Sequence, residues 1–388
     1  MTVTSASGSS SCRVVTTATA TTVALLLVLP ASAGLLAAPA GAVSGPASAA
    51  APGPRTPALT GAREAQGARG AQAVPEAQGA VQEPQGAQGV QGAQGAPGAL
   101  AGAPGGLPAS TVSANRTVSA LGWIVADART GDVIAAHHPH LRLPPASTLK
   151  ALFAVTALPR VPGGTLRKVS KADLAGVGEG SSVVGVKAGR VYRTADLWRG
   201  TFLRSGNDAV HVLAAMNGGW KSTVSQMQAK ARALGARNTR VVTADGYDAK
   251  GQYSTAYDLA LIGRAGLKDG QFAKFAATAH ARFPSSTRAN GSHLASYPIQ
   301  NTNRLLTGAN GVGRYPGLIG IKNGYTSKAG NTLIAAAKRG NRTLIVTVLN
   351  PQRGNGLAVY REARALLDWG FRSVGHVRVL GTLNQPNR

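Results

Sequence analysis

The sequence predicts an α+β fold, in which a mostly antiparallel sheet is flanked by helices and interrupted by an inserted all-helical subdomain. Two apolar runs joined by a short turn, residues 121–127 and 132–136, indicate a β-hairpin that opens the folded part. A long stretch with helical periodicity follows, over about 165–310. Three strand-like runs and a helix come last, and the short turns between these strands imply antiparallel neighbours.

The first 42 residues have the pattern of a secretory signal peptide. Arg13 precedes the apolar run 23–29, and small residues near 33 and 42 fit a cleavage site. The alternative is an uncleaved anchor, because residues 23–43 are almost free of polar side chains and approach the roughly 20 that span a bilayer. We therefore expect export, with a membrane tether if the segment is kept. The only cysteine, Cys12, precedes the apolar run, so we expect no disulfide within the chain.

Residues 43–108 consist mainly of Ala, Gly, Gln and Pro with repeated Gln-Gly-Ala units, and we expect a disordered linker. Residues 109–388 form the expected folded domain. They carry 37 of the chain's 41 Lys and Arg residues against only 12 Asp and Glu residues, so basic side chains outnumber acidic ones about three to one. This excess predicts anionic surroundings, and a solvated basic surface without a ligand is the alternative. Export and the scattered basic residues favour extracellular anionic polymers over nucleic acid.

After the hairpin, Pro144 and Pro145 precede residues 146–158, which are good helix formers closed by Pro159. Ser147 is therefore expected at the start of a helix. The inserted helices are expected at 194–216, 223–234 and 255–267. Three strands and a final helix are then expected at 318–322, 331–338, 343–349 and 358–369.

Ser147 and Lys150 are spaced to lie on one face of that helix, with Cβ atoms about 5–6 Å apart. Burial, the positive helix end and a neighbouring cation would each lower the pKa of Lys150 from about 10.4. A neutral Lys150 could accept the hydroxyl proton of Ser147, and the free N–H of Ser147 could bind an oxyanion. Alone, this spacing is also common on exposed helices.

Two further motifs follow in order, Ser205-Gly-Asn207 and Lys322-Asn-Gly324. Separately they also fit an inter-helix turn and a tight turn after a strand. Together with Ser147 and Lys150 they resemble the serine-type D-alanyl-D-alanine carboxypeptidases, the low-molecular-mass penicillin-binding proteins, whose motifs are Ser-x-x-Lys, Ser-x-Asn and Lys-Thr-Gly. The flanking segments also resemble this family, over roughly residues 115–370: 179–182, 203–209, 253–258, 301–305 and 320–330.

The resemblance implies a DD-peptidase/β-lactamase-like fold and a cofactor-free reaction on peptidoglycan stem peptides that end in D-Ala-D-Ala. Ser147 would form an acyl-enzyme, Lys150 would take and return the proton, and Ser205 would relay a proton to the leaving amine. The substrate-binding residues implied are Asn207 for the peptide amide, Lys322 for the terminal carboxylate, and Asn323, Gly324, Tyr325 and Thr326 beside them. The N–H groups of Ser147 and Tyr325 would form the oxyanion hole.

The same resemblance implies that β-lactams inhibit the enzyme and that the protein is associated with the cell wall. We expect a monomer. The family's usual Thr is Asn323 here. Because an Asn amide can still donate to a carboxylate, we expect altered affinity rather than lost activity.

Two other functions share the fold. A serine β-lactamase needs a glutamate that activates water, but the chain has none between Glu179 and Glu362, so slow hydrolysis of penicillin is expected. An inactive wall-binding homologue is disfavoured by the intact motifs. A metal site is not expected, because His137, His138 and His140 lack a carboxylate partner and are typical of a surface loop.

Overall fold

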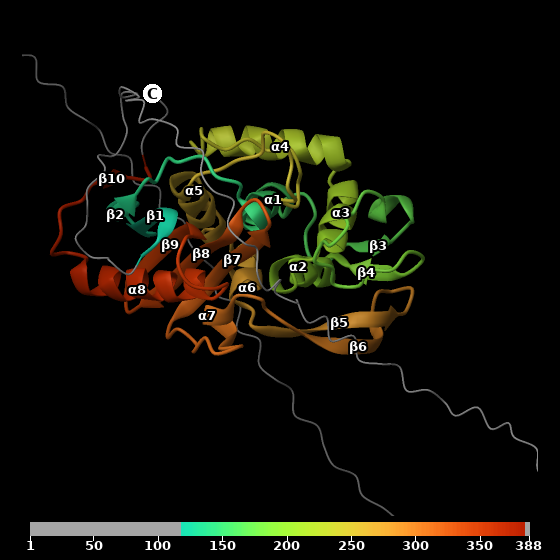
Figure 1. Cartoon of the computed structure of the whole chain (residues 1–388). Helices are drawn as coiled ribbons and strands as arrows, with labels where there is room; N and C mark the ends of the chain where they lie inside the picture. The colour runs from blue at the N-terminus through green and yellow to red at the C-terminus, as the bar shows by residue number, and fades with distance from the viewer. Residues whose placement is uncertain (1–117, 385–388) are drawn as a thin grey trace, which may run out of the picture. The chain divides into compact units, whose positions relative to one another are not determined.

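The computed structural model describes residues 118–384 (Figure 1). The expected signal peptide or anchor and the expected linker lie outside the described residues. Within the described range, no helix combines the length and hydropathy that crossing a bilayer requires.

The centre of the structure is a six-stranded antiparallel sheet in the order β10-β2-β1-β9-β8-β7 (Figure 1). Its strands are β1 (Ala120–Asp127), β2 (Asp132–His137), β7 (Leu318–Thr326), β8 (Gly330–Arg339), β9 (Arg342–Pro351) and β10 (Gly381–Thr382). The predicted hairpin and the three predicted late strands are confirmed. Because β1 pairs with β9, the first and last parts of the domain meet in mid-sheet, and β7 is left at an edge.

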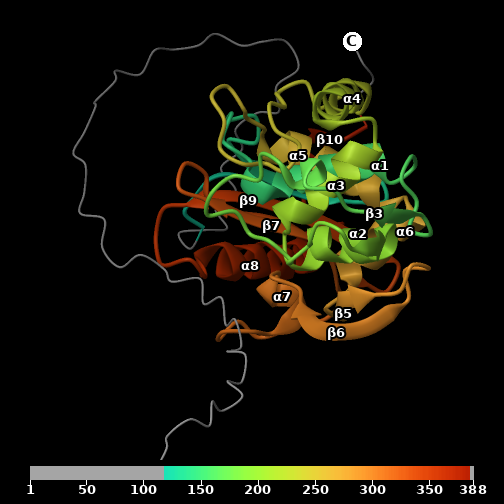
Figure 2. The same cartoon turned by 90° about the vertical axis from the view of Figure 1, so that its right-hand side faces the viewer.

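Helices cover both faces of this sheet. Helix α5 (Ala256–Leu267) packs on one face and α8 (Ala358–Ser373) on the other (Figures 1 and 2). Alternate residues of β8 enter two cores, with Ile334 in the cluster that includes α5 and Ala335 in the cluster that includes α8. Since both faces are covered, β8 reads in the sequence as a continuous apolar run.

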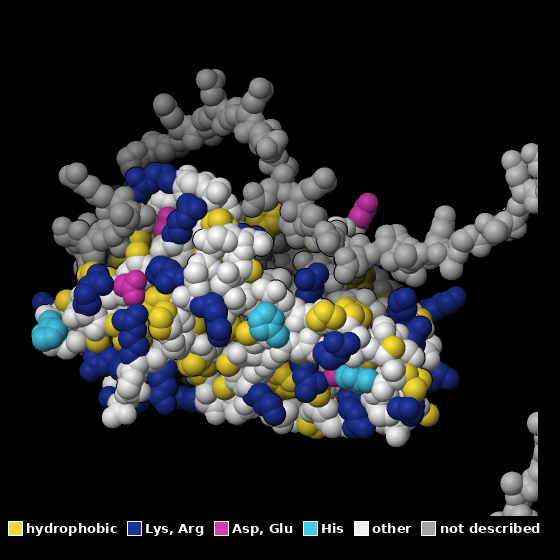
Figure 3. Space-filling model, turned by 90° about the horizontal axis from the view of Figure 1, so that it is seen from below, with side chains coloured by type: hydrophobic (Ala, Val, Ile, Leu, Met, Phe, Trp, Pro, Cys, Tyr) yellow, Lys and Arg dark blue, Asp and Glu magenta, His cyan; other side chains and the backbone are white. Residues whose placement is uncertain are grey.

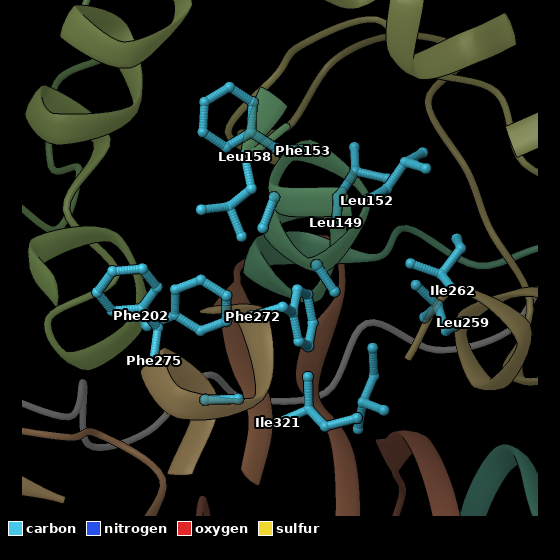
Figure 4. Close-up of a cluster of buried hydrophobic side chains, with 14 of the residues drawn as sticks. Leu149, Leu152, Phe153, Leu158, Phe202, Leu259, Ile262, Phe272, Phe275 and Ile321 are labelled. Carbon is cyan, nitrogen blue, oxygen red and sulfur yellow. The ribbon is translucent and has the colours of Figure 1, made fainter. Parts of the chain in front are cut away.

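The inserted segment between β2 and β7 supplies the remaining helices: α1 (Lys150–Ala157), α2 (Thr194–Leu203), α3 (Asn207–Met216), α4 (Trp220–Ala233), α6 (Gly270–Ala277) and α7 (Arg304–Thr307). Helix α1 is buried on nearly every side. Phe153 from α1, Phe202 from α2 and Phe272 from α6 belong to one apolar cluster around it (Figure 4). Burial of aromatic rings of this size is worth several kcal/mol, roughly 2 per side chain, and fixes the start of α1 in place.

The expectation of an all-helical insertion was wrong. The inserted segment also contains two two-stranded sheets, β3 (Leu166–Lys168) with β4 (Val191–Arg193), and β5 (His280–Thr287) with β6 (His293–Gln300). Half of the residues of β5 and β6 are exposed, and only Phe283, Pro284 and Ile299 of the two strands are buried. Polar strands of this kind lack the alternation that would have revealed them. The fold class itself is confirmed.

Candidate active site

Ser147 lies in a single 3₁₀ turn, η1 (Ala146–Leu149), that leads directly into α1. In a 3₁₀ turn the side chains at i and i+3 eclipse, so Lys150 lies directly over Ser147. The Lys150 Nζ atom is 2.8 Å from the Ser147 Oγ atom. Ser147 is partly exposed while Ala146, Thr148 and Leu149 are buried, so the hydroxyl is the accessible group of the turn.

Lys150 is 1 % exposed, and its Nζ atom also donates to the backbone carbonyl of Asp245 at 2.6 Å. Burial lowers the pKa of Lys150 to about 8, although the nearby carboxylates of Asp245 and Asp208 raise it. The lowering of the Lys150 pKa by burial was predicted from the sequence and is confirmed. The predicted lowering by a neighbouring cation is not found. A carbonyl only accepts, so one N–H is committed there and the lone pair of a neutral Lys150 is free for the Ser147 hydroxyl.

Lys322 projects from the edge strand β7 and is 1 % exposed. Its Nζ atom donates to the carbonyl of Asn323 at 2.8 Å, and none of the ion pairs within residues 118–384 involves it. Burial lowers the pKa of Lys322 well below its ordinary value, and the charge of Lys150 lowers it further. A buried amine without an anionic partner is a suitable place for a substrate carboxylate, which would restore its charge.

Gly324 brings the backbone of β7 against the nucleophile. A Cβ atom at this position would lie 2.6 Å from the Ser147 nitrogen and 2.7 Å from the Thr332 hydroxyl, so a larger residue would push the strand away. Because β7 is an edge strand, some of its backbone groups have no partner strand. Tyr325 is the residue after Gly324, and its predicted place in the oxyanion hole stays a prediction.

The second motif forms the connection between α2 and α3. Ser205 adopts a φ of 57°, which is unusual for a residue other than glycine. Its hydroxyl is buried and has no hydrogen-bond partner within the described part of the chain. A buried polar atom in a strained backbone is a common feature of functional sites.

Asn207 is the first residue of α3, and its side chain donates to the Ser181 hydroxyl at 3.0 Å. The adjacent Asp208 accepts the backbone N–H groups of Val184, Gly185 and Val186. The loop over residues 181–186 is thereby fixed beside the second motif. The family-like flank 179–182 was the sequence signal for this contact.

Asn323 and Thr326 hold neighbouring elements together. The Asn323 amide donates to the Tyr360 hydroxyl on α8 at 3.1 Å, and its oxygen accepts from the Thr302 hydroxyl at 2.9 Å. The Thr326 hydroxyl donates to Asp248 at 2.8 Å. Their predicted contacts with a substrate stay predictions.

The loop over residues 243–248 was not identified from the sequence. Gly246, with a φ of +82°, is pressed so closely against the Ala146 carbonyl that a Cβ atom would lie 2.1 Å from it. The Asp245 carbonyl thereby reaches Lys150. The Asp245 carboxylate instead accepts the Tyr247 N–H at 3.0 Å. Within residues 118–384, no carboxylate is hydrogen-bonded to Ser147 or Lys150.

The three neighbouring histidines begin at the last residue of β2, and the third, His140, is partly buried. His137 and His138 are exposed and stack on each other, with ring centroids 3.9 Å apart. In the described part of the chain, no group of three His, Cys, Asp or Glu side chains is placed to hold a metal ion.

The fold and the 2.8 Å contact between Ser147 and Lys150 fit the class of serine acyl-transfer enzymes that use a lysine base. The sequence model of one family, described as D-alanyl-D-alanine carboxypeptidase, matches residues 109–353, which is more than half of the chain. The chain belongs to the D-alanyl-D-alanine carboxypeptidase family.

Individual relatives agree with this assignment. The carboxypeptidase DacB2 of Mycobacterium tuberculosis is 41% identical over 252 residues, which cover 64% of this chain and 81% of that protein. DacC of Escherichia coli is 33% identical over 270 residues, which cover 66% of this chain and 62% of that protein. This chain thus spans most of the first relative but less than two thirds of the second.

Solved structures give the same result. A D-alanyl-D-alanine carboxypeptidase from Mycobacterium tuberculosis has a TM-score of 0.60 at 37% identity, covering 68% of this chain and 95% of that one. The Streptomyces K15 DD-transpeptidase has a TM-score of 0.60 at 27% identity, covering 66% and 99%.

Proposed function

We propose that this protein is a serine-type D-alanyl-D-alanine carboxypeptidase that removes the terminal D-alanine of peptidoglycan stem peptides through an acyl-enzyme on Ser147. The observation that carries the proposal is the 2.8 Å contact between the Ser147 hydroxyl and Lys150, whose pKa burial lowers to about 8. Membership of the family supplies the substrate class.

Acylation begins when neutral Lys150 accepts the Ser147 proton and the Oγ atom attacks the carbonyl carbon between the two D-alanines. The N–H groups of Ser147 and Tyr325 stabilise the negative charge on the carbonyl oxygen. The C–N bond then breaks, and the leaving amine takes the proton from Lys150 through the Ser205 hydroxyl. Deacylation repeats the sequence with water in place of Ser147, and the hydroxyl is regenerated.

Binding uses the remaining motif residues. Lys322 attracts the terminal carboxylate, and Asn207 holds the peptide amide on the acyl side of the scissile bond. The open edge of β7 runs past Ser147, so an extended peptide can add to the sheet there.

β-Lactams acylate the same serine, and their hydrolysis is slow. In a β-lactamase, a glutamate on the loop after the second motif would activate the water. Here the loop over residues 243–248 contributes the Asp245 carbonyl to Lys150, and the Asp245 carboxylate accepts the Tyr247 N–H. Rapid, repeated turnover of penicillin by the purified protein would contradict this part of the proposal and favour a β-lactamase.

The protein acts as an exported monomer in the cell wall, either released by signal cleavage or tethered by its N-terminal segment. The excess of basic side chains supports contact with anionic wall polymers. Figure 3 shows Lys and Arg spread over one face of the domain with few acidic side chains between them. Binding to such a polymer should weaken steeply with salt. Absence of binding to the polymer at low salt would contradict the proposed contact with the wall. Failure of export in a host with a signal peptidase would contradict the proposed location.

The direct test of the function is the release of D-alanine from an N-acylated peptide ending in D-Ala-D-Ala. The full-length protein should release D-alanine, and Ser147→Ala should not. The peptide ending in L-Ala-L-Ala is the matched substrate control and should be stable. If the wild type leaves the D-Ala-D-Ala peptide intact, the inactive wall-binding alternative becomes the better account.

A further inference from the structure

A pocket of about 540 Å³ lies at the end of the main sheet that is far from Ser147. It forms where β1 and β8 end and β9 begins, and three of its five lining residues are arginines: Asp127, Arg129, Arg339, Asn341 and Arg342. Thr332 of β8 pairs with Gly324, which contacts Ser147, and Arg339 is seven residues further along the same strand. At about 3.3 Å per residue, the pocket is roughly 23 Å from that contact. It is therefore separate from the active site.

The strand register places the charged side chains of the pocket on one face of the sheet. Arg339 and Arg342 are directly opposite each other across the β8–β9 turn, so their side chains are neighbours. Arg342 is two residues before Leu344, which pairs with Asp127, so these side chains share that face. Like charges directly opposite in a sheet are destabilising, so this pair of arginines costs stability unless an anion compensates it.

Arg339 is held in place by two other elements. Its Nη2 atom donates to the Tyr315 hydroxyl at 2.6 Å and to Asp368 on α8 at 2.9 Å. Its guanidinium also lies over the Phe371 ring, 4.5 Å from the centroid. An arginine has five N–H donors, and these bonds use only Nη2, so the other donors of Arg339 are left for a ligand.

Arg129 and Arg342 have no such partners. In the described part of the chain, neither guanidinium takes part in a hydrogen bond, an ion pair or a contact with an aromatic ring. The one carboxylate of the lining, Asp127, accepts the backbone N–H groups of Arg129 and Thr130 instead of a guanidinium. The backbone of Arg129 is fixed as well, because Arg264 on α5 donates to its carbonyl at 3.1 Å.

The pocket thus has a fixed frame and a net positive charge. Even with Asp127 and Asp368 counted, three guanidinium groups face two carboxylates. The ligand that this arrangement favours is an anion with several hydrogen-bond acceptors.

A phosphate group matches this set of donors. Arginine forks bind phosphate oxygens through paired, charge-assisted hydrogen bonds. Because the oxygens of a phosphate are arranged tetrahedrally, guanidinium groups from different strands can bond to it at once, whereas a single fork satisfies a planar carboxylate. The Asp127 carboxylate opposes a second negative charge. A phosphodiester, with one charge, therefore fits better than a free phosphate monoester, which carries about −1.5 to −2 at pH 7.

We propose that this pocket binds a phosphodiester group of an anionic wall polymer and so holds the enzyme on the wall with its active site free. The basic surface as a whole attracts any polyanion, whereas this pocket selects phosphate. The inference rests on the proposed location in the cell wall and not on the reaction at Ser147.

The test measures the binding of full-length protein to end-labelled poly(glycerol phosphate) at low salt, by fluorescence anisotropy. Arg129→Gln combined with Arg342→Gln should weaken binding by about 10-fold or more, because two charge-assisted contacts are lost. Lys221→Gln combined with Arg232→Gln is the matched control, since it removes the same charge from exposed positions on α4, and it should bind nearly as tightly as wild type. Because neither pocket guanidinium has an internal partner, the pocket variant should keep the wild-type Tm and the wild-type rate of D-alanine release.

A second polymer separates phosphate recognition from general attraction. Poly-L-glutamate with the same number of charges should bind the wild type more weakly than poly(glycerol phosphate) does, and should not distinguish the pocket variant from the control variant.

Equal loss of affinity in the pocket and control variants would overturn the inference, and so would equal binding of the two polymers. Tighter binding of single-stranded DNA through the same arginines would assign the pocket to nucleic acid instead. Binding of inorganic phosphate by the pocket without affinity for the polymer would also overturn the proposal.

A more conservative variant covers a failure of the glutamine variant to fold. Arg129→Lys combined with Arg342→Lys keeps both charges but loses the forks, so it should still weaken polymer binding, and an unchanged affinity would count against the inference. Loss of D-alanine release with polymer binding kept would count against the proposed carboxypeptidase function alone.

Discussion

The pH dependence of acylation follows from the buried position of Lys150. With a pKa of about 8, roughly one tenth of Lys150 is neutral at pH 7. A lysine at its ordinary pKa of 10.5 would be neutral about 300 times less often at that pH. We therefore expect kcat/KM to rise by about 50-fold between pH 6 and pH 8, and the acid limb to level off above about pH 9.

The assay measures D-alanine release from Nα,Nε-diacetyl-L-Lys-D-Ala-D-Ala, which carries no free amine that could titrate in place of Lys150. Asp245→Asn should move the acid limb to lower pH, because the Asp245 carboxylate raises the pKa of Lys150. Lys150→Arg keeps the charge but cannot lose its proton, and should reduce kcat/KM by about 100-fold or more. Lys221→Arg, exposed on α4, is the control and should behave as wild type.

An acid limb that rises unbroken beyond pH 10 would mean that burial does not lower the pKa of the base, which contradicts this prediction. Retention of the limb and of the rate in Lys150→Arg would refute it as well, since another group would then be taking the proton from Ser147.

Substitutions at two further positions test the geometry around the nucleophile. Gly324→Ala places a methyl group 2.6 Å from the Ser147 nitrogen, so the unfolding free energy should fall by about 1–3 kcal/mol and the acylation rate by about 100-fold. Gly270→Ala, which has open space around it, is the control. Equal acylation rates for the two variants would contradict the close approach of Gly324 to Ser147. Ser205→Ala should slow acylation by about 100-fold or more with little change in Tm, because its hydroxyl has no partner to lose. Ser205→Gly should slow acylation as much as Ser205→Ala does but should have a higher Tm, since glycine adopts a φ of 57° freely. An unchanged acylation rate in both variants would show that Ser205 does not carry the proton to the leaving amine.

The sequence was sufficient where the chemistry is local. Ser147 and Lys150 are close because they are three positions apart, and this spacing brings side chains together in an α-helix and in a 3₁₀ turn alike. Five of the six strands of the main sheet were visible, because helices cover both faces and this forces continuous apolar runs such as that in β8; the two-residue strand β10 was missed. Short turns predicted the pairing of β1 with β2 and of β7, β8 and β9 in order, but not the pairing of β1 with β9 or of β2 with β10.

The sequence was insufficient where a backbone atom or a distant contact does the work. The acceptor for Lys150 is the Asp245 carbonyl, 95 residues away, and any residue type could supply a carbonyl. The contact of Asn323 with Tyr360 on α8 likewise depends on how the helix crosses the sheet, which no local pattern records. A pocket lined by His211, Trp220 and Asp245 could not be predicted either, because it exists only where α3, α4 and the loop over residues 243–248 meet.

The mass of the protein after brief exposure to penicillin tests the acyl-enzyme on Ser147 most directly. One penicillin should add to each wild-type molecule, digestion should place it on the peptide containing Ser147, and Ser147→Ala should gain no mass. An unmodified wild type, or an adduct on any residue other than Ser147, would contradict the assignment of this serine as the acyl-enzyme nucleophile.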